Sequence, residues 1–158
     1  MSRALHLENI AKAQAEIEAK GPLAGQGKMR QRYHFMGEEG WINDPNGLIF
    51  FKGRYHFFYQ FNPYDSFWGA MHWGHAVSDD MLHWEYLPVA LAPSEDYDNH
   101  REGGCFSGSA IEHEGKLYLF YTGTTNYGDG FVQTQCMAVS EDGIHFEKYH
   151  GNPIIEAP

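Results

Sequence analysis

The N-terminal region has the periodicity of a helix. Across residues 5–20, apolar side chains recur at steps of three and four: Leu7, Ile10, Ala13 and Ile17. This spacing places them on one face, so it predicts an amphipathic helix that packs against a larger body. The pair Gly21-Pro22 is expected to end the helix, and the glycines that follow predict a linker over residues 21–31.

From residue 41 onward the pattern changes to short runs of aromatic and β-branched residues, which favour strands. The expected strands fall into two groups of four: 47–52, 54–61, 72–78 and 83–90, then 107–112, 116–122, 132–140 and 145–149. The sequences Ser-Asp-Asp-Met and Ser-Glu-Asp-Gly supply the turn before the last strand of each group. The chain therefore divides into an arm of helix and linker, residues 1–32, and a β-rich unit, residues 33–158.

The two groups of strands are copies of one pattern, 62 residues apart. Residues 53–59 (Gly-Arg-Tyr-His-Phe-Phe-Tyr) align with residues 115–121 (Gly-Lys-Leu-Tyr-Leu-Phe-Tyr), and residues 76–80 align with residues 138–142 without a gap. A four-stranded unit repeated in tandem is typical of β-propeller blades. Because propellers contain roughly 4–8 blades, two blades predict the N-terminal part of a longer protein. The alternative is a pair of blades that completes its ring by self-association.

Composition and charge exclude several classes of protein. The chain is 42% hydrophobic and 20% charged, which excludes disorder, and no run approaches the ~20 apolar residues of a membrane-spanning helix. Residues 33–158 carry five Lys/Arg and 18 Asp/Glu, so nucleic acid is not an expected partner, whereas a neutral polar ligand is compatible. The first residues lack the apolar core of a signal peptide, which predicts a cytoplasmic location.

Cysteines and histidines show no pattern of a metal site. Cys105 and Cys136 could form one disulfide, but two isolated cysteines favour buried, reduced thiols. His72 and His75 stand three residues apart without the spacing of a zinc motif. We expect ordinary strand histidines there and no metal.

The segment Trp41-Ile42-Asn43-Asp44-Pro45-Asn46-Gly47 holds the strongest candidate for chemistry. Its Asp-Pro-Asn-Gly sequence at 44–47 suits a type I turn. The segment also precedes the first strand of the first group, and first strands face the central channel of a propeller. Its flanking aromatic residues suit a ligand site with a flat apolar face and a few polar groups. From the spacing alone, a simple turn and a catalytic Asp44 both stay open.

This segment resembles the signature of glycoside hydrolase family 32, which contains β-fructofuranosidases, invertases and sucrose-6-phosphate hydrolases. Similar motifs follow in the family's order: Tyr59-Gln60-Phe61-Asn62-Pro63, Trp68-Gly69, His72-Trp73-Gly74-His75-Ala76 and Phe106-Ser107-Gly108-Ser109. The resemblance runs from about Tyr33 to the end of the chain. It implies an all-β fold in which the chain forms the first two blades of a five-bladed propeller, preceded by the short N-terminal helix. In the family, the rest of the propeller and a C-terminal β-sandwich complete the protein.

The resemblance implies hydrolysis of the β-fructofuranosyl linkage of sucrose or sucrose-6-phosphate by a retaining mechanism, without a metal or organic cofactor. Asp44 would be the nucleophile and would form a covalent fructosyl-enzyme that water then hydrolyses. The residues implied to bind the small fructoside substrate are Trp41, Ile42, Asn43, Gln60, Trp68, Phe106 and Ser107. Ordinary packing is the competing interpretation for Trp68 and Phe106.

Two of the family's three catalytic carboxylates are absent from the 158 residues, which contain neither its Glu-Cys motif nor its Arg-Asp-Pro motif. Glu102 is the least implausible substitute for the acid/base Glu, but we do not expect it in that role. This chain alone is therefore expected to be inactive. An inactive carbohydrate-binding remnant and a transfructosylase stay as alternatives. Arg101 is the only Lys/Arg between Arg54 and Lys116, so the choice between sucrose and its 6-phosphate stays open.

Overall fold

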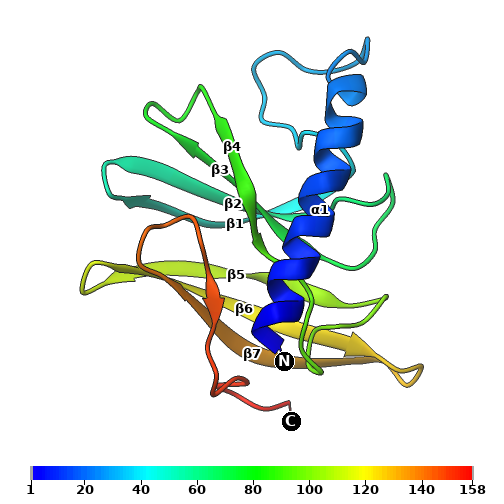
Figure 1. Cartoon of the computed structure of the whole chain (residues 1–158), viewed down its shortest axis with the longest axis vertical. Coiled ribbons are helices and arrows are strands. Elements are labelled where there is room, and N and C mark those ends of the chain that lie inside the picture. The colour runs from blue at the N-terminus through cyan, green and yellow to red at the C-terminus, as the bar shows by residue number, and fades with distance from the viewer. Residues whose placement is uncertain (1, 158) are drawn as a thin grey trace.

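The computed structural model describes residues 2–157 and contains one long helix and two four-stranded sheets (Figure 1). The elements are α1 (Ser2–Ala24), β1 (Trp41–Phe51), β2 (Arg54–Asn62), β3 (His72–Ser78), β4 (Glu85–Leu91), β5 (Gly104–His113), β6 (Lys116–Asn126), β7 (Phe131–Ser140) and β8 (Glu147–Lys148). Each sheet is an antiparallel meander whose strands are hydrogen-bonded in chain order. They are the two predicted four-stranded units, called blade 1 (β1–β4) and blade 2 (β5–β8).

The sequence repeat of 62 residues is also a repeat of structure. Phe57 pairs with Ala76 between β2 and β3, and Leu119 pairs with Ala138 between β6 and β7, so both partners shift by 62. Equivalent positions nevertheless face different neighbours: Leu119 and Tyr121 of blade 2 are buried against blade 1, whereas their equivalents Phe57 and Tyr59 lie in the cluster beside α1. Opposite faces of the two blades therefore meet. The shared core between the blades follows from this arrangement, with Phe58 of blade 1 packed among the buried residues of blade 2.

The last hairpin of each blade is closed by the same hydrogen-bonded turn. Asp80 Oδ1 accepts the backbone N–H of His83 at 2.8 Å, and Asp142 Oδ1 accepts that of His145 at 2.8 Å. The imidazole Nδ1 of each histidine lies 2.7 Å and 2.6 Å, respectively, from the other carboxylate oxygen. Hydrogen bonds from the backbone and ring of His83 hold the pKa of Asp80 well below its usual range. The predicted structural role of these two aspartates in turns is confirmed.

The first strand begins earlier than the sequence predicts. β1 runs continuously from Trp41, and the segment 44–47 lies within it rather than in a type I turn, so that expectation is wrong. The pairing of β1 with β2 shifts register between Ile42 and Pro45 and again between Asn46 and Ile49. β1 is the edge strand of its sheet, and an edge strand can accommodate a proline because one row of its N–H groups needs no partner. These two register shifts allow β1 to continue through the turn-like sequence at 44–47.

The helix is longer than predicted at both ends. It starts at Ser2 and continues through Pro22 to Ala24, so Gly21-Pro22 does not end it. Proline lacks an N–H donor and its ring crowds the carbonyl four residues earlier, which usually kinks or ends a helix. The backbone N–H of Gly25 still donates to the Gly21 carbonyl at 2.8 Å, which carries the helical bonding past the proline.

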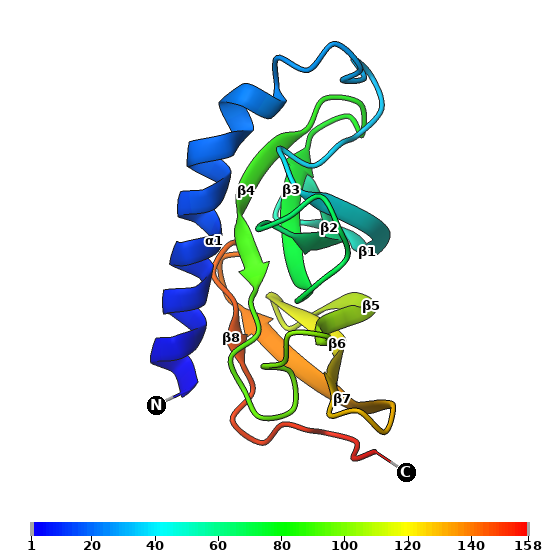
Figure 2. The same ribbon diagram turned by 90° about the vertical axis from the view of Figure 1, so that its right-hand side faces the viewer.

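Helix α1 lies along the outer side of both blades, beside β4 and β8, while β1 and β5 lie on the opposite side (Figure 2). Ala13 and Ile17 are buried in an apolar cluster with Tyr59, Phe61 and Val89, and Ile10 packs against it. Leu7, the first residue of the predicted stripe, is about half exposed instead. The prediction of a helix packed on a larger body is confirmed, and it leaves the inner strands of both blades free of the helix.

A buried ion pair ties the segment between the blades to blade 2. Lys148 Nζ lies 2.6 Å from Asp98 Oδ2, and their side chains are 5% and 0% exposed. Lys148 also donates to the Ala92 carbonyl at 2.8 Å and to Ser94 Oγ at 3.0 Å. Asp98 in turn accepts the backbone N–H of Ser94 at 2.8 Å and the Tyr121 hydroxyl at 3.0 Å. Both charges are therefore fully hydrogen-bonded, which a buried pair needs in order to be stable.

We predict that Lys148→Met lowers the free energy of unfolding by about 3–5 kcal/mol, because it leaves the Asp98 carboxylate buried without its counterion. The matched control is Lys116→Met. Lys116 pairs with Glu141 at 2.8 Å, but both side chains are exposed and solvent screens the pair, so its loss should cost far less stability. Urea denaturation of the two variants measures the difference. Equal losses would contradict the role assigned to the buried pair.

Two buried histidines face each other in the core between the blades. His56 Nδ1 lies 3.0 Å from His75 Nε2, and His75 Nδ1 has no hydrogen-bond partner among the described residues. Burial lowers the pKa of both histidines, and for His75 the neighbouring His56 lowers it further. Phe58 stacks on His75 with ring centroids 4.3 Å apart. Protonation would therefore place an unpartnered N–H and a positive charge in an aromatic core, so the folded state holds these histidines neutral.

This arrangement predicts a loss of stability toward acid. The unfolded chain takes up protons near pH 6.5, whereas His75 in the folded chain resists them, so stability is complete above pH 6.5 and falls below it. His6 and His72, whose pKa burial lowers to about 4, act in the same direction. For His75 the slope is at most about 1.4 kcal/mol per pH unit.

The measurement is the free energy of unfolding at pH 7.5 and pH 5.5 for the wild type and His75→Gln. We expect the variant to be less stable at pH 7.5 but to lose less stability on acidification. His83→Gln is the control, because His83 is exposed and Asp80 raises its pKa. Because its raised pKa makes His83 stabilise the folded state toward acid, His83→Gln should lose at least as much stability on acidification as the wild type. An unchanged acid dependence in His75→Gln would refute the assignment.

Candidate active site

The candidate nucleophile lies where the first strands of the two blades meet. β1 and β5 lie beside each other, and the Ser107 hydroxyl of β5 donates to Asp44 Oδ2 of β1 at 2.7 Å. The Asp44 side chain is exposed. The structure therefore joins two predicted site residues that stand 63 positions apart, and it leaves the carboxylate open to a ligand.

Glycine at position 47 permits the close approach of β1 to β5. Gly47 has a φ of +52°, and a Cβ atom there would lie 3.1 Å from the Ala110 Cβ and 3.1 Å from the Phe58 ring. Both the backbone conformation and the space favour glycine. Three residues upstream, Asp44 thereby reaches the neighbouring blade.

Backbone bonds between the blades set the position of β5. The Met71 N–H donates to the Gly103 carbonyl at 2.9 Å, and the Cys105 N–H donates to the Met71 carbonyl at 2.9 Å. A side chain of β2 also bonds to β5: Gln60 Nε2 donates to the Cys105 carbonyl at 2.8 Å. Gln60 is buried, and this bond directs its amide nitrogen at β5. Its predicted contact with substrate stays a prediction.

Three aromatic rings form a cluster that includes Phe106, the residue directly before Ser107 in β5. The ring centroids of Trp68 and Phe106 are 5.9 Å apart, those of Phe106 and Phe131 are 5.8 Å apart, and those of Trp68 and Phe131 are 6.4 Å apart. Trp68 is 42% exposed and Phe131 is 54% exposed. The cluster therefore offers apolar ring surface to solvent beside the strand that carries Ser107. Sequence reasoning missed Phe131, whose only signal is an aromatic residue that directly follows the Asp-Gly turn at 129–130.

The remaining predicted site residues lie in different surroundings. Trp41 Nε1 donates to Asn43 Oδ1 at 2.9 Å, so these two neighbours of Asp44 bond to each other. Ile42 packs against the apolar cluster that α1 covers. Glu102 accepts a hydrogen bond from Asn126 at 3.3 Å and makes no described contact with Asp44.

Both cysteines are buried and free, which confirms the prediction of reduced thiols. Burial raises the pKa of each thiol, so neither is a reactive thiolate. Within residues 2–157, no group of three or more His, Cys, Asp or Glu side chains could hold a metal ion. No helix in the same range is long and apolar enough to cross a membrane.

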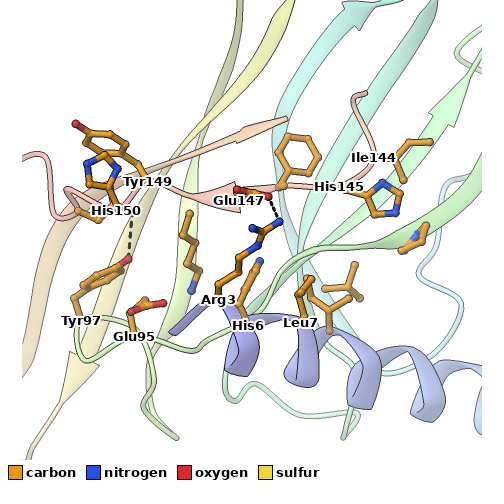
Figure 3. Close-up of a pocket in the computed structure, with 16 residues that line it drawn as sticks. Arg3, His6, Leu7, Glu95, Tyr97, Ile144, His145, Glu147, Tyr149 and His150 are labelled. Carbon is orange, nitrogen blue, oxygen red and sulfur yellow. Dashed lines mark hydrogen bonds and ion pairs between the residues drawn. The ribbon is translucent and has the colours of Figure 1, made fainter. Parts of the chain in front are cut away.

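A cavity of about 520 Å³ lies between α1 and residues 144–150 of blade 2 (Figure 3). Arg3 and His6 of the helix face Glu147 across it, and Arg3 forms an ion pair with Glu147. None of the predicted site residues lines this cavity. It belongs to the seam between the helix and the blades rather than to the site around Asp44.

The chain belongs to glycosyl hydrolase family 32, whose N-terminal domain model matches residues 34–158. It is 48% identical over 155 residues to a sucrose-6-phosphate hydrolase of Zymomonas mobilis, an alignment that covers 96% of this chain and 30% of that protein. Among solved structures, it is similar to the family 32 β-fructofuranosidase of Bombyx mori, with a TM-score of 0.82 and 42% identity over 94% of this chain and 31% of that one. A mutant of that enzyme has been solved in complex with sucrose.

A sucrose-6-phosphate hydrolase from Lactobacillus gasseri is also similar, with a TM-score of 0.81 and 34% identity over 92% of this chain and 29% of that one. This chain spans about 30% of the length of these relatives. The family match confirms that the two sheets are the first two blades of the family's propeller.

Proposed function

We propose that this chain forms the nucleophile-bearing part of a retaining β-fructofuranosidase that hydrolyses sucrose or sucrose-6-phosphate. The observation that carries the proposal is the exposed Asp44 carboxylate at the junction of the two inner strands, with one oxygen held by Ser107. A carboxylate in such a place is open to a substrate while its orientation is restrained. The names of the similar hydrolases agree with this chemistry.

In the proposed reaction Asp44 attacks the anomeric carbon of the fructosyl unit, and the glucosyl oxygen leaves with a proton. Ser107 engages Oδ2, whereas Oδ1 accepts no hydrogen bond from the described residues and so is the attacking atom. The resulting ester is hydrolysed by water, which restores the carboxylate. A second carboxylic acid about 5–5.5 Å away must supply and then remove the proton. That acid would come from the family's Glu-Cys motif, in the rest of the propeller.

The aromatic cluster would bind the sugar beside Asp44. Trp68, Phe106 and Phe131 present ring faces and edges to solvent, and sugars place their C–H faces against such rings. Trp41, Asn43 and Gln60 would add hydrogen bonds to the fructosyl hydroxyls, and Ile42 would support them from the apolar side. The choice between the two sucrose substrates and the cytoplasmic location both stay predictions.

The first test is Asp44→Asn in a protein that has the full length of the relatives, rather than in the 158-residue chain. We expect turnover of sucrose and sucrose-6-phosphate to fall by at least about 10⁴-fold, because the amide cannot form the ester. The free energy of unfolding should change little, since Asp44 is exposed. Asp65→Asn, which changes an exposed carboxylate outside the site, is the control and should keep wild-type turnover. An active Asp44→Asn would remove the nucleophile assignment.

The second test concerns the chain by itself. Purified residues 1–158 should release no fructose from either substrate at any pH between 4 and 8, because the chain contains only one of the three carboxylates. The full-length protein under the same conditions is the positive control, and its products at high sucrose also distinguish hydrolysis from transfer to a second sugar. Measurable release by the 158-residue chain would show that another acid, such as Glu102, serves as proton donor.

A further inference from the structure

Ser107 reaches Asp44 because β5 is irregular at this residue. In the pairing of β5 with β6, Phe106 lies opposite Thr122 and Gly108 lies opposite Tyr121, so Ser107 has no partner of its own. One extra residue in a strand is a β-bulge, which redirects the side chain that it carries. A Cβ atom at Gly108 would lie 1.9 Å from the Phe120 carbonyl oxygen, so the bulge depends on glycine there.

Blade 1 holds this bulge from both sides. The Trp73 indole Nε1–H donates to the Phe106 carbonyl at 3.0 Å, directly before Ser107. Directly after it, the Gly108 N–H donates to Asn46 Oδ1 at 3.3 Å. Trp73 is 0% exposed and Asn46 is 3% exposed, so each side chain is fixed by its own packing. The backbone on either side of Ser107 is therefore bound by side chains of the opposite blade.

The Trp73 ring has little freedom to move. It packs against Phe58, with centroids 5.8 Å apart, inside the core cluster that both blades share. Indole has a single N–H donor, and here it is directed at the Phe106 carbonyl. A rigid donor on β3 thus sets the orientation of a peptide group on β5, and through it the direction of the Ser107 hydroxyl.

We propose that Trp73 is a positioning residue for the fructosidase reaction, acting through the Phe106 carbonyl to keep the Ser107 hydroxyl on Asp44 Oδ2, with Asn46 holding the other side of the bulge. The inference rests on the proposed function, since it concerns the orientation of the proposed nucleophile. It assigns a role to a buried core residue that touches neither the substrate nor the reacting atoms. The role is to keep Oδ1 of Asp44 aimed for attack.

The test is a double-mutant cycle in the full-length protein, with Trp73→Phe, Ser107→Ala and the double variant. We expect each single variant to lower kcat about 10- to 100-fold with KM within about twofold, because a misdirected nucleophile slows chemistry more than binding. If Trp73 acts through Ser107, the double variant should be no slower than Ser107→Ala alone. Losses that multiply, or a Trp73→Phe variant with wild-type kcat, would overturn the proposal.

Trp84→Phe is the matched control. Trp84 is a half-buried tryptophan of blade 1 that packs on Phe35 and Phe57, away from the bulge. It should lose stability without a loss of kcat, and an equal loss of kcat would show that Trp73 has only a packing role. If Trp73→Phe does not fold, β-(3-benzothienyl)alanine at position 73 keeps the ring shape and removes only the N–H, and the same cycle applies.

The outcomes also separate this inference from the proposed function. A wild-type protein that fails to hydrolyse both substrates contradicts the proposed function and the inference together. If the wild type is active but the losses of kcat in Trp73→Phe and Ser107→Ala multiply in the double variant, only the positioning role is contradicted.

Discussion

The buried pair of Asp98 and Lys148 is the interaction on which the arrangement of the two blades depends. Asp98 belongs to the segment between the blades, and Lys148 belongs to the last strand of blade 2. Lys148 also holds the Ala92 carbonyl, to which His6 of α1 bonds at 3.1 Å. One network therefore joins the helix, the connecting segment and the outer strand. Because the Asp98 carboxylate also accepts backbone N–H groups and the Tyr121 hydroxyl, the charges are compensated inside the core rather than exposed at its rim.

The network of Asp98 and Lys148 lies on the outer side of the blades, so β1 and β5 can approach each other closely on the inner side. Helix α1 covers the outer strands, so the edges of β1 and β5 meet without an intervening element (Figure 2). The backbone bonds of Met71 and the glycine at position 47 bring the two strands near enough for Asp44 and Ser107 to share a hydrogen bond. The site thus results from the packing of two blades, and neither blade contains it alone.

In the proposed reaction this chain supplies the nucleophile, and the rest of the propeller would supply the proton donor. This chain spans about 30% of the length of its relatives, and a propeller site collects residues from several blades around one axis. The exposed rings of Trp68 and Phe131 both contact Phe106 of β5, next to Ser107. The acid/base carboxylate of the proposed reaction would come from a part of the propeller beyond these two blades.

Sequence by itself determined the elements that depend on local or repeated patterns. The 62-residue repeat predicted both blades, the aspartate turns at 80 and 142 followed from turn chemistry, and the motif at 41–47 singled out Asp44. The prediction of a turn at 44–47 was wrong because the pairing of an edge strand outweighed the local preference of these residues. The predicted end of the helix was wrong because helical hydrogen bonds continue beyond Pro22. Only tertiary structure decided the partners of Asp44, Trp73 and Phe131. These contacts join residues that are far apart in the chain, and their geometry depends on a bulge and on inter-blade packing, which no short sequence pattern encodes.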